Sequence, residues 1–103
     1  MQFLVLGYDG DDDKALDRRL AVRADHLALG DEMTARGEML VGFAMLDDSG
    51  KMRGSAIVVD LPDRAAVDAW LEVEPYVTGD VWRRIEVTLC KVGPSCESMF
   101  PSS

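Results

Sequence analysis

Apolar residues alternate with polar ones in some stretches of this chain and recur every three or four positions in others. Four stretches show strand patterns, either alternation or short continuous apolar runs: residues 2–8, 38–46, 54–61 and 81–92. Helical spacing is found in residues 13–36 and in a shorter stretch that opens at Pro62. Residues 72–80 are expected to form a loop, since Pro75 and Gly79 interrupt the pattern. The predicted order is strand, helix, strand, strand, helix, strand.

The long predicted helix has two apolar stripes. We expect the stronger stripe to face the core, because its residues recur at spacings of four, four and three: Leu16, Leu20, Ala24 and Leu27. A weaker stripe beside it contains Val22, His26, Leu29 and Met33. His26 and Arg19 are therefore predicted on the flank of the core, with Arg23 at its border, where side chains can line a cleft.

The predicted order of elements is that of an α+β, ferredoxin-like βαββαβ fold. In this fold two helices cover one face of a four-stranded antiparallel sheet. The first three predicted strands are apolar on both faces, although helices can cover only one. We therefore expect the second face to pack against another copy of the chain. The resulting homodimer, with two stacked sheets, would be a dimeric α+β barrel.

Composition and charge narrow the class of protein. The 103 residues are 48% hydrophobic and 29% charged, and we expect one domain over residues 1–92 with a tail at 93–103. The formal net charge of −8 argues against nucleic acid or an anionic membrane as a partner, because both bind to basic surfaces. No stretch has the ~20 apolar residues of a membrane span, and the apolar N-terminus has no basic segment before it. The two cysteines are too few for a disulfide scaffold, so we expect a reduced, cytoplasmic protein.

Acidic and metal-binding residues give no ion site. The acidic runs at residues 9–13 and 47–48 lack the ligand spacing of a calcium loop, so we interpret both as solvated turns. Cys90 and Cys96 show no metal-ligand spacing with the single histidine. There is also no glycine-rich phosphate loop. We therefore expect no metal and no cofactor.

His26 is the candidate for proton transfer, because imidazole is the usual acid or base near neutral pH. Glu74, held beside a proline, could orient the imidazole if the fold brings the two together. Each candidate also has a structural interpretation. His26 could cap a hydrogen bond, Glu74 could cap a turn, and Arg23 could pair with one of the many acids. Ser55 and Tyr76 could supply hydroxyl groups to a ligand or form structural hydrogen bonds.

Several short runs carry a family resemblance: residues 23–27, Gly37 and Gly42, Gly54-Ser55, and residues 69–77 followed by 79–81. In their order and spacing they resemble the YciI-like (YCII-related) family of small bacterial proteins, over roughly residues 1–92. The resemblance implies a dimeric α+β barrel with a His–Asp dyad in a pocket. The histidine falls on His26. The acid falls on Glu74, where the family usually has aspartate before Pro-Tyr, so a side chain one methylene longer stands in its place.

Two functions follow as hypotheses. One is a cofactor-free enzyme that transfers a proton on a small cyclic or aromatic acid, by isomerisation or elimination; one relative in the family is a dehydrochlorinase of a chlorinated hydroxyquinol. His26 and Glu74 would be its catalytic pair, and the substrate-binding residues would be Arg19, Arg23, Ser55 and Tyr76. The alternative is a non-catalytic dimer that binds a small ligand or a protein partner. The change from aspartate to glutamate favours this alternative.

Overall fold

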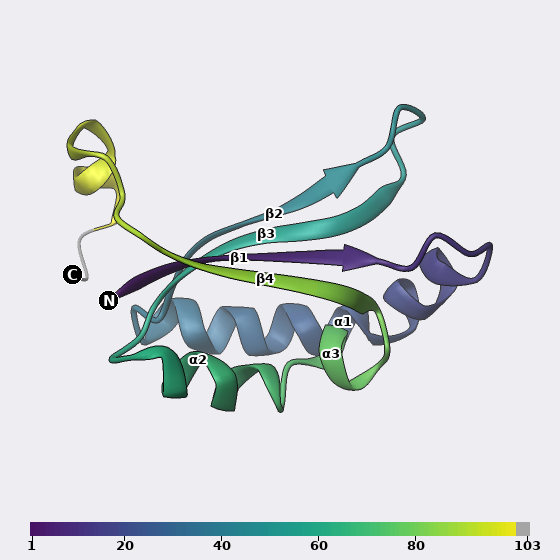
Figure 1. Cartoon of the computed structure of the whole chain (residues 1–103), viewed down its shortest axis with the longest axis horizontal. Helices are drawn as coiled ribbons and strands as arrows, with labels where there is room; N and C mark the ends of the chain where they lie inside the picture. The colour runs from purple at the N-terminus through teal and green to yellow at the C-terminus, as the bar shows by residue number, and fades with distance from the viewer. Residues whose placement is uncertain (101–103) are drawn as a thin grey trace.

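One antiparallel sheet lies over the helices in a computed structural model that describes residues 1–100 (Figure 1). The strands are β1 (Gln2–Asp9), β2 (Met39–Leu46), β3 (Met52–Asp60) and β4 (Trp82–Cys90). The helices are α1 (Ala15–Ala35), α2 (Arg64–Leu71), the short α3 (Pro75–Thr78) and a 3₁₀ helix (Pro94–Met99). The sheet order is β2-β3-β1-β4, and every neighbouring pair is antiparallel. This is the predicted α+β, ferredoxin-like fold.

The segment between α2 and β4 is more regular than the sequence indicated. We expected a loop over residues 72–80, and this was wrong for residues 75–78, which form α3. The Glu74 side chain accepts a hydrogen bond from the Tyr76 backbone N–H, and Pro75 occupies the first helical position, where a missing N–H costs nothing. The local cap thus builds one helical turn directly below the sheet.

Helix α1 turns a different face to the sheet than its hydrophobicity suggested. The stripe predicted to face the core is largely open, with Leu20 51% and Leu27 45% exposed. The face that packs on the sheet is the weaker stripe, which ends in the buried Met33. Arg19 is also on this face and forms a buried ion pair with Asp9 at the end of β1. The prediction of the core-facing stripe was wrong because the ion pair with Asp9 orients α1 with Arg19 towards the sheet.

The core lies between the helices and one face of the sheet. Its fully buried members come from every layer and include Val5, Val59, Val67 and Tyr76. Gly7 allows Trp82 to lie flat against β1, because a Cβ at Gly7 would be 2.3 Å from the Trp82 ring. In this position the indole N–H of Trp82 donates to Ser55 Oγ at 3.3 Å.

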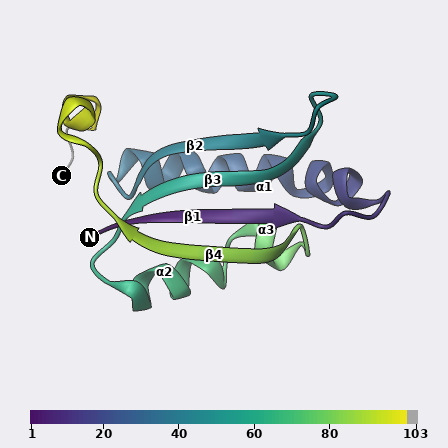
Figure 2. The ribbon, with the colours of Figure 1, turned by 45° about the horizontal axis from the view of Figure 1, so that its top comes forward.

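The opposite face of the sheet carries no helix, as Figure 2 shows. In the observed register Leu4 is paired with Val58 and Leu6 with Ala56, so these four side chains share the uncovered face. Phe43 on the neighbouring strand belongs to the same face and is 60% exposed. One of the two apolar faces of the sheet therefore has no helix packed against it within a single chain.

Among the helices of residues 1–100, none combines the length and the apolarity needed to cross a bilayer.

Candidate functional site

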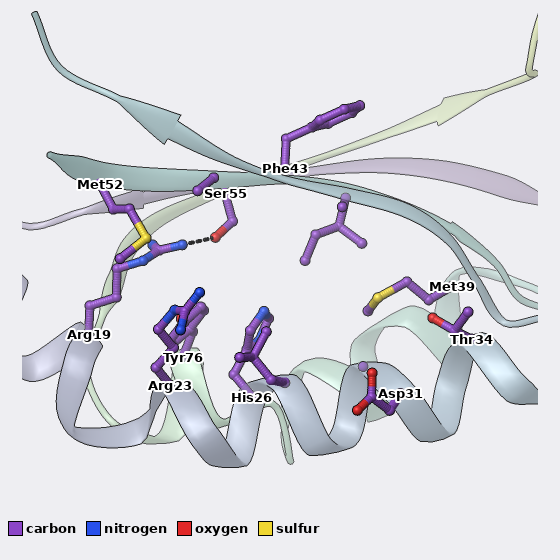
Figure 3. Close-up of a pocket in the computed structure, with 15 residues that line it drawn as sticks. Arg19, Arg23, His26, Asp31, Thr34, Met39, Phe43, Met52, Ser55 and Tyr76 are labelled. Carbon is purple, nitrogen blue, oxygen red and sulfur yellow. Dashed lines mark hydrogen bonds between the residues drawn. The ribbon is translucent and has the colours of Figure 1, made fainter. Parts of the chain in front are cut away.

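A cavity of about 270 Å³ lies between α1 and the helix-covered face of β2 and β3 (Figure 3). Five of the six predicted site residues line it: Arg19, Arg23, His26, Ser55 and Tyr76. The sixth, Glu74, is fully buried beside His26. The fold therefore brings together residues from α1, β3 and α3 that are up to 57 positions apart in the chain, from 19 to 76.

His26 and Glu74 form a direct pair. Nδ1 of His26 hydrogen-bonds Oε1 of Glu74, and the same oxygen accepts the backbone N–H of Tyr76 at 3.2 Å. Because a carboxylate can only accept, this bond places the ring proton on Nδ1 and leaves the lone pair on Nε2. The His26 side chain is 13% exposed, so the ring is partly open to the cavity while its carboxylate partner is not. The second oxygen of Glu74, Oε2, is buried without a hydrogen-bond partner among residues 1–100.

Aromatic rings hold His26 on two further sides. Tyr76 stacks on the imidazole with ring centroids 3.9 Å apart and an angle of 17° between the planes. Trp82 approaches the imidazole edge-on, with centroids 6.2 Å apart. Burial raises the pKa of Tyr76 above its ordinary value, so its hydroxyl keeps its proton through the neutral range. The rings and the Glu74 bond together fix the orientation of the imidazole.

Arg19 lies behind these rings as a buried cation. Its Nη1 donates to both oxygens of Asp9, at 3.0 and 3.1 Å, and its guanidinium lies 4.4 Å from the centroid of Tyr76. Burial raises the pKa of Asp9, and the charge and hydrogen bond of Arg19 oppose that shift. Arg19 lines the cavity with a charge already matched by Asp9, so it suits positioning of its neighbours better than capture of an anion.

Ser55 has an unused hydroxyl proton. Its Oγ accepts Nη2 of Arg19 at 2.7 Å and Nε1 of Trp82 at 3.3 Å. A serine oxygen has two acceptor positions, and these two donors fill them. The O–H remains free to donate, and Ser55 lines the cavity. The arrangement offers a hydrogen-bond donor to a ligand oxygen.

Arg23 is the cation at the mouth of the cavity. It lies on α1 one turn before His26, is exposed, and makes no ion pair with any residue between 1 and 100. The alternative interpretation, a salt bridge to one of the acids, is thus absent from the part of the chain that the structure describes. A free guanidinium at this place can bind a carboxylate or phenolate with its planar fork.

Two residues of the site were missed in the sequence. Asp9 was assigned to a solvated turn, and this was wrong, because its side chain is only 2% exposed and pairs with Arg19. The signal was the alternation of β1, in which Phe3, Val5 and Gly7 face the helices and Asp9 continues the series. Trp82 was not among the candidates named from the sequence; it belongs to the core, and its indole N–H also donates to Ser55 in the cavity wall.

The site offers acid–base chemistry with an anion-binding group. It holds an oriented imidazole, a free guanidinium and a free hydroxyl, all on one cavity. Residues 1–100 contain no group of three or more His, Cys, Asp or Glu side chains placed to hold a metal ion. The arrangement suits removal or delivery of a proton on a small acidic molecule.

Comparison with known proteins gives the same family as the sequence motifs. A family model described as the YCII-related domain matches residues 1–91. Protein YciI of Escherichia coli is 29% identical over 86 residues, which cover 78% of this chain and 88% of that protein. Protein YciI of Shigella flexneri matches with the same identity and coverage.

Two solved structures show the same fold. A 5-chloro-2-hydroxyhydroquinone dehydrochlorinase from Burkholderia phenoliruptrix, in complex with 2,5-dihydroxybenzoquinone, superposes with a TM-score of 0.78 at 24% identity, over 92% of this chain and 98% of that one. A dimeric ferredoxin-like protein from a Jannaschia species has a TM-score of 0.55 at 15% identity, over 88% and 98%. At these identities the likeness establishes the fold. With its domain matched along nearly the whole length, the chain belongs to the YCII-related family.

Proposed function

We propose that this protein is a cofactor-free enzyme that transfers a proton on a small cyclic or aromatic acid, in an elimination or an isomerisation. The observation that carries the proposal is the His26–Glu74 pair at the wall of the cavity. Glu74 holds the proton on Nδ1, so Nε2 can act as a base towards a bound molecule. The similarity in fold to a dehydrochlorinase supports the elimination branch.

The neighbouring groups have matching roles. Arg23 binds the anionic group of the substrate, which places a carbon-bound or hydroxyl proton near His26. In an elimination, Nε2 takes that proton while the leaving group departs with its bonding electron pair. In an isomerisation, the imidazolium returns the proton to another carbon. Glu74 stabilises the imidazolium in both cases, and the Ser55 hydroxyl donates to an oxygen that gains negative charge.

The test is a substrate screen followed by variants of one residue. Purified protein is incubated with a panel of aromatic and cyclic acids that includes chlorinated hydroxyquinols, and products are followed by mass spectrometry. His26→Ala is expected to lower the rate by about 10²–10⁴-fold, the usual contribution of a positioned base. Asp25→Ala serves as the matched control, because Asp25 is the exposed residue beside His26 on α1 and does not line the cavity.

Two results would contradict the enzyme proposal. An unchanged rate in His26→Ala removes the imidazole from the mechanism. A ligand that binds in the cavity and is recovered unchanged favours the second candidate, a non-catalytic binding protein. The feature behind this second candidate is Glu74 itself, which is one methylene longer than the aspartate that the family resemblance implies at this position.

We also propose that the protein works as a homodimer that stacks the uncovered faces of two sheets. The support is the apolar face formed by Leu4, Leu6, Phe43, Ala56 and Val58, for which one chain provides no cover. Burial of such a face removes apolar surface from water and stabilises the pair. Because the cavity lies on the other side of the sheet, each copy keeps its own site.

A further inference from the structure

Two glycines in the interior of regular elements line the cavity, Gly30 in α1 and Gly42 in β2. Glycine in the interior of a helix or strand lowers stability relative to alanine, because the unfolded chain loses more freedom on folding. Both glycines therefore lower the stability of the fold relative to alanine. Either the backbone geometry requires glycine at these positions, or the glycines serve another purpose.

The fold does not require either glycine. Neither has the positive φ found at Gly37 and Gly50. A Cβ at Gly30 would meet only the Met39 sulfur, at 3.6 Å, and a Cβ at Gly42 would meet only a methylene of Ile57, at 3.7 Å. These are ordinary contact distances. By contrast, a Cβ at Gly7 would be 2.3 Å from the Trp82 ring.

What the two glycines do provide is space beyond His26. Gly30 follows His26 by four residues and so lies on the same face of α1, one turn further along. Around this space the wall is apolar, formed by Leu27, Met39 and Ile57. The absence of side chains at positions 30 and 42 extends the cavity from the imidazole towards the far end of the helix.

The two ends of the cavity differ in charge: arginines lie at one end, and an acidic and a hydroxyl side chain lie at the other. Figure 3 shows Asp31 and Thr34 on the side of His26 away from Arg19 and Arg23. Within residues 1–100, neither Asp31 nor Thr34 makes an ion pair or a side-chain hydrogen bond. Arg23 and Asp31 are eight positions apart on α1, which corresponds to about 12 Å along the helix axis. The cavity thus has a free cation at one end and a free carboxylate at the other.

We propose that the space beside Gly30 and Gly42 is a second binding subsite, which selects the substrate of the proposed reaction. It accepts the flat apolar body of a ligand whose acidic group is at Arg23. A hydroxyl or amino group at the other end of that ligand donates to Asp31, with Thr34 beside it. The substrate class is therefore an aromatic acid with a hydrogen-bond donor opposite its acidic group. This inference rests on the proposed function, since it shares that cavity and the binding of the acidic group by Arg23.

The test uses 4-hydroxycinnamate and cinnamate, two aromatic acids that differ by one hydroxyl. Binding is followed by NMR through the ring signals of His26, which is the only histidine. We expect 4-hydroxycinnamate to bind at least tenfold more tightly than cinnamate, and Asp31→Ala to reduce that ratio to about one. Gly30→Ala and Gly42→Ala are expected to weaken 4-hydroxycinnamate at least tenfold, because each Cβ fills the subsite.

Stability separates a filled subsite from a damaged fold. Gly30→Ala is expected to raise Tm by about 4 °C or more, because alanine favours a helix interior and the new Cβ makes an ordinary contact. Gly93→Ala is the matched control: a Cβ there meets nothing within 4 Å, and both affinity and Tm should stay unchanged. A variant that loses binding while gaining stability fits only a position kept open for a ligand.

Other results overturn the inference. These are equal affinities of the two acids for the wild type, no shift of the His26 signals with either acid, or full binding by Gly30→Ala. None of them touches the proton-transfer proposal, which is tested by the rate of His26→Ala. Conversely, His26→Ala could keep the wild-type rate while the wild type still discriminates between the two acids. That result would contradict the proposed chemistry and leave the subsite proposal standing.

Discussion

The rings of Tyr76 and His26 stack with their centroids 3.9 Å apart and their planes 17° apart. Tyr76 is also linked to the same histidine through its backbone, because its N–H donates to the Glu74 oxygen that the imidazole contacts. One residue of α3 therefore fixes the imidazole both by its ring and by its place in the chain. This arrangement makes Tyr76 a positioning residue for His26.

Replacement of Tyr76 should separate the role of the ring from that of the hydroxyl. Tyr76→Ala removes a fully buried aromatic side chain and is expected to lower the free energy of unfolding by about 3–5 kcal/mol. Tyr76→Phe keeps the ring and should cost less than about 1.5 kcal/mol. In NMR spectra, the His26 ring protons should move in the alanine variant and stay close to wild type in the phenylalanine variant. Equal effects of the two substitutions would show that the hydroxyl, not the stack, matters.

Gly7 is expected to tolerate no side chain. A Cβ at this position would be 2.3 Å from the rigid indole of Trp82, so Gly7→Ala must displace the ring. We expect a loss of about 1–3 kcal/mol in the free energy of unfolding and a change in tryptophan fluorescence. Gly93→Ala, where the added Cβ meets nothing within 4 Å, is the control and should change stability by less than about 0.5 kcal/mol. A stable Gly7→Ala with native fluorescence would contradict the close packing.

The buried pair of Arg19 and Asp9 should be far more sensitive to removal of one partner than of both. The two side chains are 3% and 2% exposed, so Arg19→Met leaves an uncompensated carboxylate and is expected to cost about 3–5 kcal/mol. Adding Asp9→Leu to that variant should recover part of the loss. Urea unfolding at neutral pH measures both. Additive losses in the double variant would show that the two charges are not coupled.

Acid should weaken the fold through Asp12 rather than through Asp9. Hydrogen bonds from Arg18 lower the pKa of Asp12 below its ordinary 3.8, so its stabilising effect is present above pH 3.8 and lost as pH falls towards the folded value. Burial raises the pKa of Asp9, which gives the opposite sign: its contribution is present below 3.8 and lost as pH rises through the folded value.

The corresponding experiment compares wild type with Asp12→Asn across the acid range. The variant should be less stable at neutral pH, and the difference should shrink as pH is lowered below 3.8. Thermal unfolding at a series of pH values measures this difference. If the difference in stability were the same at all pH values, the effect of the substitution would not come from the charge of Asp12.

Association through the uncovered sheet face can be tested at Phe43. This side chain is 60% exposed in one chain and points away from the cavity in Figure 3. Phe43→Glu places a charge on the face and is expected to convert a dimer to a monomer in sedimentation at micromolar concentration, with the single chain still folded. Leu20→Glu, at a 51% exposed leucine on the outer side of α1, is the control and should leave the mass unchanged. A wild type that sediments as a monomer would contradict the proposed dimer.

Local pattern was sufficient for the elements and their order, because strand alternation and helical spacing are properties of neighbouring residues. It also singled out His26 and Glu74 through the short motifs around them. The local pattern did not predict which face of α1 packs against the sheet. Leu20 and Leu27 form the more hydrophobic stripe, yet Arg19 and Met33 face the sheet, because a buried contact with Asp9 adds an attraction that hydrophobicity alone does not contain.

The sequence by itself thus determined the α+β fold, the family and the two residues, His26 and Glu74, whose side chains are hydrogen-bonded at the cavity. Tertiary structure alone decided that the acid at the end of β1 is buried, that Ser55 keeps a free hydroxyl proton, and that Gly30 and Gly42 border one cavity. The physical reason is that these properties depend on partners from strands and helices distant in the chain. A residue's own type and its immediate neighbours fix the local conformation, whereas burial, charge pairing and empty space arise only when the layers pack.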